Sequence, residues 1–284
     1  MSRILVIGAK GMLGRDLVEG LRSSFRGDEV VGWDIDEIDI QEEKDTIAKI
    51  ESLRPRIVIN VAAYTDVDGC ELHKERAFAI NAEGMRHVAL GAVRCDAKVV
   101  YLSTDYIFDG KKGEPYVEDD LPNPINVYGH SKLKGEEYVL ELAREALIVR
   151  TQWLYGRSGN NFVDIILRQA REKEVLSVVN DQTGLPTYTV DLSKAISLLI
   201  ERDARGIFHV ANSNPCTWYN YAKKILEFSG IKRVKVLPIS SKELDRLALR
   251  PSYSVLDTQK FQREIGMTLR PWPEALKDYL STYS

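Results

Sequence analysis

A short apolar run near the start of the chain is followed by a glycine-rich turn and then by apolar residues at helical spacing. The run Arg3-Ile4-Leu5-Val6-Ile7 is rich in β-branched residues, which is typical of a strand buried on both faces. Leu17, Val18 and Leu21 recur on one face of a helix. Residues 8–14 separate the two patterns, so we predict a strand, a glycine turn and a helix in that order.

Apolar runs and helical patterns keep alternating through the first half of the chain. The apolar runs predict strands at residues 30–33, 57–61, 98–102 and 147–150. The helical patterns predict helices at residues 44–53, at 70–97 with a break near Asn81, and at 128–145. This alternation is typical of an α/β fold with a doubly wound parallel sheet, whose ligands lie beyond the carboxyl ends of the strands.

The pattern is harder to interpret after residue 150. Helices are predicted at residues 161–172, 191–201 and 218–228, with strands at 178–179 and 207–210. We therefore predict a dinucleotide-binding Rossmann domain at residues 1–150. Residues 151–284 are expected to form a mixed region that completes the sheet and builds a smaller C-terminal substrate-binding lobe. The long connection at residues 108–127 is rich in Gly, Pro, Asp and Lys, which indicates either function or mobility.

The composition narrows the classes of protein to which the chain can belong. With 284 residues, 44% of them hydrophobic, the chain can bury a large core. Its formal charge of −3 leaves no basic surplus to neutralise phosphates, which argues against a nucleic-acid partner. Cys70, Cys95 and Cys216 are odd in number and widely spaced, so we expect reduced thiols in a cytoplasmic protein, without a disulfide framework or zinc site. No apolar run is long enough for a signal peptide or a membrane span, so we expect no membrane partner.

The glycine turn and the end of the second predicted strand indicate a dinucleotide site. Gly8, Gly11 and Gly14 are spaced G-x-x-G-x-x-G between a strand and a helix, where backbone N–H groups at the helix N-terminus can bind a pyrophosphate. Asp34 lies twenty residues after Gly14, where a dinucleotide fold places the carboxylate that binds the adenosine ribose. The alternative for Asp34 is a solvated loop acid, because acidic residues are dense at positions 34–39.

Tyr128 and Lys132 have the spacing of a proton donor and the cation that tunes it. Residues four apart lie on one face of a helix, so a helix that begins near Tyr128 points both side chains at one spot. An unperturbed phenol titrates near ~10, a pKa poorly matched to proton transfer at neutral pH, and a nearby ammonium lowers it. Ser103 or Thr104, at the end of a predicted buried strand, can donate a hydrogen bond to the same carbonyl oxygen. We therefore predict hydride transfer to a ketone, with Tyr128 as the acid.

The same spacing occurs at Tyr219 and Lys223, so spacing alone decides nothing. A chain with 13 tyrosines produces such a pair by chance. Tyr128 follows a hydroxyl-bearing strand end and a nucleotide fingerprint, whereas no such strand precedes Tyr219, so we assign the function to Tyr128. Trp153 lies just past the end of another predicted strand. Two roles stay open for its side chain: stacking on a ligand or packing in the core.

Seven stretches of the chain carry motifs that match a known family. They are NVAAYTDVD from Asn60, STDYIFDG from Ser103, NVYGHSKLKGE from Asn126, RTQWLYG from Arg150, DQTGLPT from Asp181, GIFHVA from Gly206 and RPSYSVLD from Arg250. These stretches span nearly the whole chain and resemble the dTDP-4-dehydrorhamnose reductase family of the extended short-chain dehydrogenase/reductase superfamily. The resemblance implies reduction of the 4-keto group of the nucleotide sugar dTDP-4-dehydro-L-rhamnose to give dTDP-L-rhamnose.

The resemblance also implies a role for each matching residue. Tyr128 is expected to be the proton donor, Lys132 to hold the nicotinamide ribose and lower the tyrosine pKa, and Thr104 to bond the reacting oxygen. Asp105 and Trp153 are expected to contact the sugar. The coenzyme is expected to lie against Gly8, Lys10, Gly11, Met12, Leu13, Gly14, Asp34, Asp39, Ile40, Ala62, Ala63, Tyr64, Thr65 and Ser103, together with Tyr128 and Lys132.

NADH is the expected coenzyme, because an Asp34 carboxylate would repel the 2′-phosphate of NADPH. Lys10 and Arg15 lie in or beside the glycine turn and can neutralise that phosphate, and members of the family often accept both coenzymes, so NADPH stays open. Met12 stands where many members have a polar residue. Some members hold a metal between subunits, but no such ligand set is recognisable in this chain. We therefore assign no metal, and a homodimer is one candidate state.

Three other functions are weighed against this one. A nucleotide-sugar 4,6-dehydratase or epimerase uses the same Tyr–Lys pair, but dehydratases carry Asp-Glu directly after the catalytic Thr, and here Asp105-Tyr106 follows Thr104. A non-catalytic regulatory subunit, such as that of methionine adenosyltransferase, keeps the fold and the nicotinamide site, but intact Thr104, Tyr128 and Lys132 favour an enzyme. A reductase of another nucleotide-linked 4-ketosugar is not excluded, because variable loops supply the base and sugar contacts.

Overall fold

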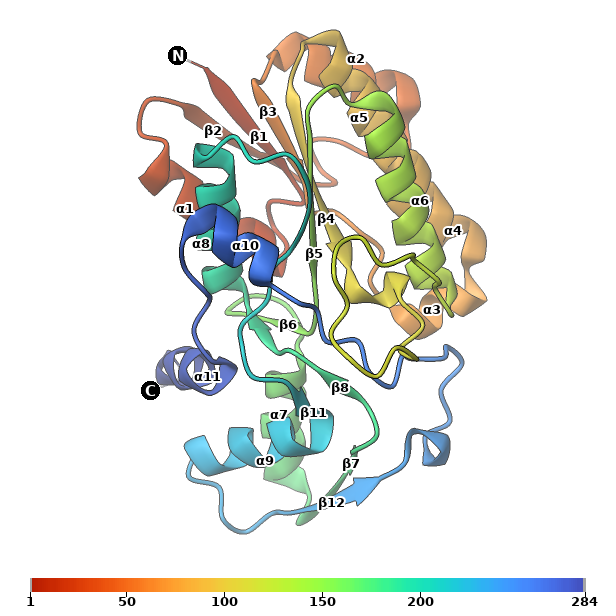
Figure 1. Ribbon diagram of the computed structural model, residues 1–284, viewed down its shortest axis with the longest axis vertical. Helices are drawn as coiled ribbons and strands as arrows, with labels where there is room; N and C mark the ends of the chain where they lie inside the picture. The colour runs from red at the N-terminus through yellow and green to blue at the C-terminus, as the bar shows by residue number, and fades with distance from the viewer. Residues whose placement is uncertain (1, 283–284) are drawn as a thin grey trace.

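The computed structural model, which describes residues 2–282, is built on one six-stranded sheet whose strands are all parallel (Figure 1). In spatial order the strands are β10 (Gly206–His209), β5 (Ala146–Thr151), β4 (Lys98–Thr104), β3 (Ile57–Asn60), β1 (Arg3–Ile7) and β2 (Glu29–Trp33). The strand order reverses between β1 and β3, so the chain leaves the two in opposite directions. A crevice for a ligand forms at such a point in doubly wound sheets.

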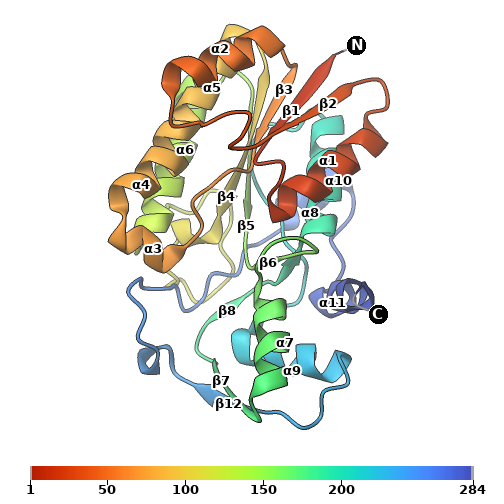
Figure 2. The same cartoon turned by 180° about the vertical axis from the view of Figure 1, so that it is seen from behind.

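Helices cover both faces of the sheet, as a doubly wound fold requires (Figures 1 and 2). One face is covered by α2 (Glu43–Leu53), α5 (Gly84–Arg94) and α6 (Val127–Leu142). The other face is covered by α1 (Met12–Ser24), α8 (Thr189–Glu201) and α10 (Gln259–Ile265). The central strands are buried on both sides, which explains their continuous apolar runs. The predicted α/β class and parallel Rossmann sheet are confirmed.

The predicted break near Asn81 is a real change of helix type. The segment is divided into α3 (Val67–Leu72), α4 (Lys74–Phe78) and a π-helical turn at Ala79–Glu83, after which α5 begins. A π-helical turn inside an α-helix often marks a functional site. The helix predicted at 128–145 ends earlier, at Leu142, because Ala143 has an extended backbone conformation (φ −80°, ψ 128°).

A smaller lobe lies below the sheet and has an aromatic core (Figure 1). Its helices are α7 (Phe162–Glu172), α9 (Trp218–Phe228) and α11 (Trp272–Ser281). Its strands pair two by two as β6 (Leu154–Tyr155) with β9 (Thr187–Tyr188), β8 (Thr183–Gly184) with β11 (Cys216–Thr217), and β7 (Val175–Val179) with β12 (Lys235–Ile239). Tyr155, Tyr188, Tyr221 and Tyr279 are buried together at its centre.

The second half of the chain also contributes to the upper layer. Helix α8 supplies Leu192 and Ile196 to the hydrophobic cluster under α1, and β10 and α10 add Phe208 and Phe261 to that cluster. The chain therefore returns from the lobe to the sheet after residue 150. The division of the chain at that residue stays a prediction.

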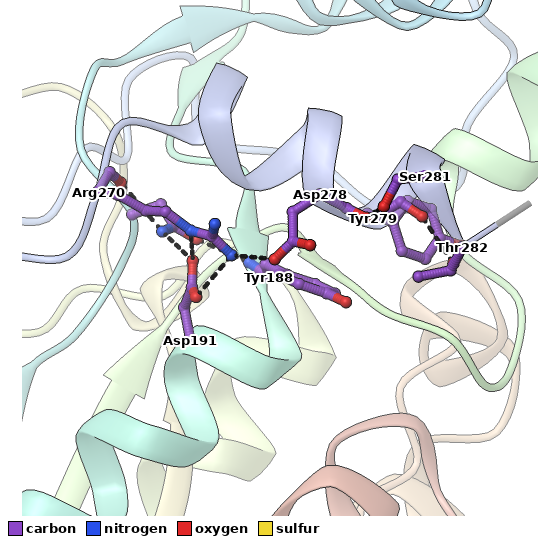
Figure 3. Close-up of polar contacts among 8 residues, drawn as sticks. Tyr188, Asp191, Arg270, Asp278, Tyr279, Ser281 and Thr282 are labelled. Atoms are coloured by element: carbon purple, nitrogen blue, oxygen red, sulfur yellow. Dashed lines mark hydrogen bonds and ion pairs between the residues drawn. The ribbon is translucent and has the colours of Figure 1, made fainter.

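A polar network attaches α11 to the start of α8 (Figure 3). The Arg270 guanidinium donates to both carboxylate oxygens of Asp191, at 2.8 and 3.0 Å, and to Asp278 of α11 at 2.7 Å. Asp191 also accepts from Asn212 Nδ2 at 2.8 Å. Asp191 is buried, and these donors provide the partners that a buried carboxylate requires. The network joins the last helix of the lobe to a helix that packs on the sheet.

The long connection at residues 108–127 is held in place by packing. Phe108 stacks on Tyr116 with ring centroids 4.2 Å apart, and both pack against Leu256. The Tyr116 N–H donates to the Val255 carbonyl at 2.8 Å. Of the two explanations for its length, function or mobility, these contacts argue against mobility.

Candidate active site

A cavity of about 770 Å³ lies beyond the carboxyl ends of β1, β3, β4 and β5, between the sheet and the lobe. Most of the residues predicted from the sequence line it. They are Gly8, Lys10, Gly11, Met12, Leu13, Asp34, Ala62, Ala63, Thr65, Ser103, Thr104, Asp105, Tyr128, Lys132 and Trp153. Segments far apart in the chain are thus brought to one cavity.

Four predicted residues lie outside its lining. A side chain at Gly14 would place Cβ 2.0 Å from the Gly8 carbonyl oxygen, so this glycine lets α1 pack against the turn. Ile40 is buried in the core, Asp39 accepts from the Gln41 side chain, and the Tyr64 N–H donates to Asn81 Oδ1 at 2.8 Å. Direct coenzyme contacts from these four residues stay predictions.

The glycine turn leaves the N-terminus of α1 open to the cavity. Gly8 has φ of +87°, a conformation that favours glycine, and a Cβ there would lie 2.7 Å from the Ala62 nitrogen. No side chain caps the helix at Gly11, and no acidic residue stands in its first turn. The N–H groups of this turn are therefore suited to an anionic group. Met12 points toward the loop at Gly156, so its side chain contributes packing.

Asp34 is one of two acidic residues that line this cavity, the other being Asp105. Its carboxylate accepts the Lys10 N–H at 2.8 Å and the Ile35 N–H at 2.9 Å, which fixes its orientation. The Lys10 ammonium pairs with Asp36 and lies 3.5 Å from Glu37. Lys10 therefore has acidic partners of its own, and within residues 2–282 the donors to the Asp34 carboxylate are backbone N–H groups.

Lys132 is buried at the base of the site. Its ammonium donates to the Leu102 carbonyl at 2.7 Å and lies 4.0 Å from the centre of the Tyr101 ring. Burial lowers the pKa of Lys132 to about 7, although Glu136, one turn further along α6, opposes the shift. A lysine with this pKa changes its charge within the physiological pH range.

Tyr128 lies one turn before Lys132 and is half-buried. Burial raises the pKa of Tyr128, and a hydrogen bond with the Thr104 hydroxyl opposes the rise. The phenol is therefore protonated at neutral pH. The predicted lowering of this pKa by Lys132 stays a prediction about the reacting complex.

The end of β4 and the residue after it bring three polar side chains to the cavity that Tyr128 lines. The Thr104 hydroxyl donates to Asp105 Oδ1 at 3.1 Å and accepts from the Tyr106 N–H at 3.2 Å. Asp105 is 2% exposed, and burial raises the pKa of its carboxyl to about 7 against hydrogen bonds from Ser254 and Thr104. Ser103 Oγ is buried without a hydrogen-bond partner within residues 2–282. This wall of the cavity is thus suited to a polar ligand.

Asn81, in the π-helical turn, joins two walls of the site, which motif reasoning missed. Its Nδ2 donates to Ser131 Oγ at 2.9 Å and to the Tyr64 backbone carbonyl at 3.1 Å, and its backbone carbonyl accepts from the Tyr101 hydroxyl at 3.1 Å. It thereby holds the turn at residues 62–65 against α6. The only sequence signal was the break in the helical pattern.

Trp153 is stacked on Trp218, which sequence reasoning also missed. The ring centroids are 3.5 Å apart with 11° between the planes, and both residues line the cavity. Trp153 has φ of +47°, which is uncommon for a non-glycine residue. Tyr106, Gln152 and Asn160 also line the cavity, although no sequence periodicity points to them.

The second Tyr–Lys pair lies away from this cavity. Tyr219 packs against the lobe core, and the Lys223 ammonium lies 5.3 Å from the centre of its ring. Neither residue lines the cavity.

Within residues 2–282, no group of three or more His, Cys, Asp or Glu side chains could hold a metal ion. No helix in the same range has the length and apolar character that a membrane crossing needs.

The chain matches known proteins along its whole length. The family model described as RmlD substrate binding domain matches residues 1–284. A spore coat polysaccharide biosynthesis protein, SpsK of Bacillus subtilis, is 40% identical over 284 residues, with 100% of this chain and 99% of the relative covered. A dTDP-4-dehydrorhamnose reductase of Aggregatibacter actinomycetemcomitans is 37% identical, with 98% of each chain covered. The crystal structure of dTDP-4-dehydrorhamnose reductase from Bacillus anthracis in complex with NADP superimposes with a TM-score of 0.95 at 40% identity, covering 99% of this chain and 100% of that one.

Proposed function

We propose, from the premise that this chain belongs to the RmlD substrate binding domain family, that it reduces dTDP-4-dehydro-L-rhamnose to dTDP-L-rhamnose. The protein is an oxidoreductase that uses NADH or NADPH. One observation carries the proposal: the glycine turn and Asp34 line the same cavity as Thr104, Tyr128 and Lys132. A dinucleotide and a ketone can therefore meet within it.

The residues of the glycine turn fit a dinucleotide. Side chains at Gly8 or Gly14 would collide with neighbouring backbone, and the uncapped N-terminus of α1 offers N–H donors to a pyrophosphate. Asp34 is oriented to accept hydrogen bonds from ribose hydroxyls. When bound, the reduced nicotinamide supplies the hydride that the ketone carbon accepts.

Tyr128 donates a proton to the ketone oxygen in the proposed reaction. Its raised pKa keeps the phenol protonated before the reaction, and the Thr104 hydroxyl orients it. Lys132 in its charged form stabilises the phenolate left behind. Asp105 and Trp153, which line the same cavity, are proposed to contact the sugar.

The other functions have less support. Asp105-Tyr106 after Thr104 lacks the second carboxylate of a dehydratase, and Thr104, Tyr128 and Lys132 lie together as an enzyme requires. We also propose a cytoplasmic location, supported by three free cysteines. A nucleotide-sugar substrate fits the family, and a homodimer stays a prediction.

A coupled assay tests the substrate. We expect NADH oxidation only when a dTDP-4-keto sugar is supplied together with the 3,5-epimerase that produces the L-rhamno configuration, because that sugar is the proposed substrate. Absorbance at the coenzyme band measures the rate. Turnover of a simple ketone at comparable efficiency would contradict a nucleotide-sugar role. No turnover of any keto sugar, alongside tight NADH binding, would instead support a regulatory subunit.

Asp34→Ala is expected to relax the preference for NADH. The wild type should favour NADH by about tenfold, since ~1.4 kcal/mol of repulsion between Asp34 and the 2′-phosphate gives that ratio. The variant should use NADPH better and NADH worse, as kcat/KM for the two coenzymes will measure.

Asp45→Ala is the matched control for Asp34→Ala, because Asp45 pairs with Lys49 on α2 and lies outside the cavity lining. Its coenzyme ratio should equal that of the wild type. A wild type that prefers NADPH, or an unchanged ratio in Asp34→Ala, would remove Asp34 from the ribose site.

A further inference from the structure

Residues 246–250, here called the strap, run from the lobe to the start of the catalytic helix α6. Just beyond the strap, the Ser252 carbonyl accepts from the Thr183 N–H at 2.8 Å, and the Ser254 N–H donates to the Thr183 carbonyl at 3.1 Å. These bonds attach this part of the chain to β8 of the lobe. The Leu249 carbonyl, within the strap, accepts from Asn126 Nδ2 at 2.8 Å.

Asn126 is the residue at which α6 begins. It is 4% exposed, and its Oδ1 caps the helix by accepting the Gly129 N–H at 2.8 Å. The side chain therefore holds the strap with one atom and the first turn of α6 with the other. Tyr128 stands in that turn.

Asp68 of α3 fixes the other side of the strap. Its two carboxylate oxygens accept from Arg250 Nη1 and Nη2 at 3.1 and 2.9 Å, which is a planar two-bond fork. The same carboxylate accepts the Ala248 N–H at 3.1 Å and Arg246 Nη1 at 2.9 Å. Burial raises the pKa of the Asp68 carboxyl, but these hydrogen bonds, led by that of Arg250, outweigh burial and hold the pKa well below its usual range. The fork is therefore charged throughout the neutral range.

Arg250 also lies beside a ring that touches the proton donor. Burial raises the pKa of Tyr106, and the neighbouring Arg250 guanidinium opposes that rise. The Tyr106 ring packs edge-on against Tyr128, with centroids 5.8 Å apart and 79° between the planes. Its backbone also limits α6, since a Cβ at Gly129 would lie 2.1 Å from the Tyr106 carbonyl oxygen.

We propose that Arg250 is a positioning residue for the reductase reaction: clamped by Asp68, it fixes Tyr106 and the strap, and through them the ring of Tyr128. The proposal rests on the proposed function for its kinetic consequence. Arg250 reaches the proton donor by two routes, through the Tyr106 ring and through Leu249 and Asn126. Loss of the fork therefore frees Tyr128 to leave the geometry that proton transfer needs, without removing any group that reacts.

Arg250→Met is expected to lower kcat by about 10- to 10²-fold at saturating sugar, the size of effect that a misplacement near 1 Å produces. The dissociation constant for NADH should be unchanged. Arg250→Lys should not restore kcat, because an ammonium is a point charge and cannot form the fork. An Arg250→Met variant that is folded and keeps kcat within twofold of the wild type would overturn the proposal. So would an Arg250→Lys variant with wild-type kcat, or a rise in the sugar KM alone, which would make Arg250 a substrate contact.

Arg246→Met is the matched control. Arg246 bonds the same Asp68 carboxylate, but its side chain is 55% exposed, and no bond links it to Tyr106 or Asn126 within the described residues. Its kcat should stay within about twofold of wild type, as for an exposed ion pair of small energetic weight. A loss equal to that of Arg250→Met would assign both effects to the stability of the strap and overturn the positioning role.

Hydrogen exchange provides a readout that needs no substrate. The backbone amides of residues 129–131 should exchange faster in Arg250→Met and at the wild-type rate in Arg246→Met. Absent turnover by the wild type contradicts the proposed function but leaves this comparison intact. Equal exchange in wild type and Arg250→Met contradicts the positioning role whatever the substrate proves to be.

Discussion

Tyr128→Phe is expected to lower kcat by a factor of about 10² to 10⁴, the usual contribution of general acid catalysis. The substitution keeps the ring, its edge-on contact with Tyr106 and its place in α6, and removes only the hydroxyl. Binding of NADH should therefore be retained. Steady-state rates and a fluorescence titration with NADH measure the two quantities separately.

Tyr219→Phe is the internal control for this result. Tyr219 also precedes a lysine by four residues, but it packs against the lobe core and outside the cavity lining. Its kcat should stay close to that of the wild type. Equal rates in the two variants would show that Tyr128 is not the acid.

Lys132→Met is expected to lower kcat by about 10² or more and to weaken NADH binding, because charge and a proposed ribose contact are lost together. The pH–rate profile should also change: the apparent pKa of the acid, which shows on the alkaline limb, should move upward, because an ammonium no longer stabilises the phenolate. A profile and rate equal to those of the wild type would remove Lys132 from the mechanism.

The free energy of unfolding of Lys132→Met shows whether its loss of activity is due to unfolding. Burial lowers the pKa of Lys132 from 10.5 to about 7, so the folded state binds fewer protons than the unfolded state between these pH values. The free energy of unfolding of the wild type, relative to the variant, should therefore rise with pH from about 7 towards 10.5. At pH 7 and below, the variant lacks the unfavourable burial of an ammonium. We expect it to stay folded in thermal denaturation while inactive.

The sequence predicted the helices and strands in which apolar residues form a continuous run or recur at a regular spacing. The strand at Arg3–Ile7 has its predicted bounds, because a β-branched run before glycine allows few alternatives. The two-residue ladders, such as β8 with β11, were missed because two residues carry no periodicity. Helices α10 and α11 were missed as well, although Trp272, Leu276 and Tyr279 of α11 are buried in the lobe.

Residues of the candidate site could be predicted where they lie close together in the sequence. Tyr128 and Lys132 are four residues apart on one helix, so their spacing is visible in the chain. Asp68 and Arg250 are separated by 182 residues, and the fork between them is set by the fold alone. The stack of Trp153 on Trp218 is of the same kind, since it joins the end of a sheet strand to a helix of the lobe. Contacts of this kind follow from topology, which local patterns do not contain.

The return of the chain from the lobe to the sheet constrains how relatives can exchange parts by recombination. A crossover at residue 150 would transfer β10, α8 and α10 from one relative together with its lobe. The transferred side chains would include Leu192, Phe208 and Phe261, which pack against α1 in the intact protein. A chimaera of two distant relatives would thus join halves with mismatched volumes in the cluster beneath the glycine turn. Substrate range in such a family is expected to change by substitutions within the cavity lining, because the lobe cannot be inherited as a separate module.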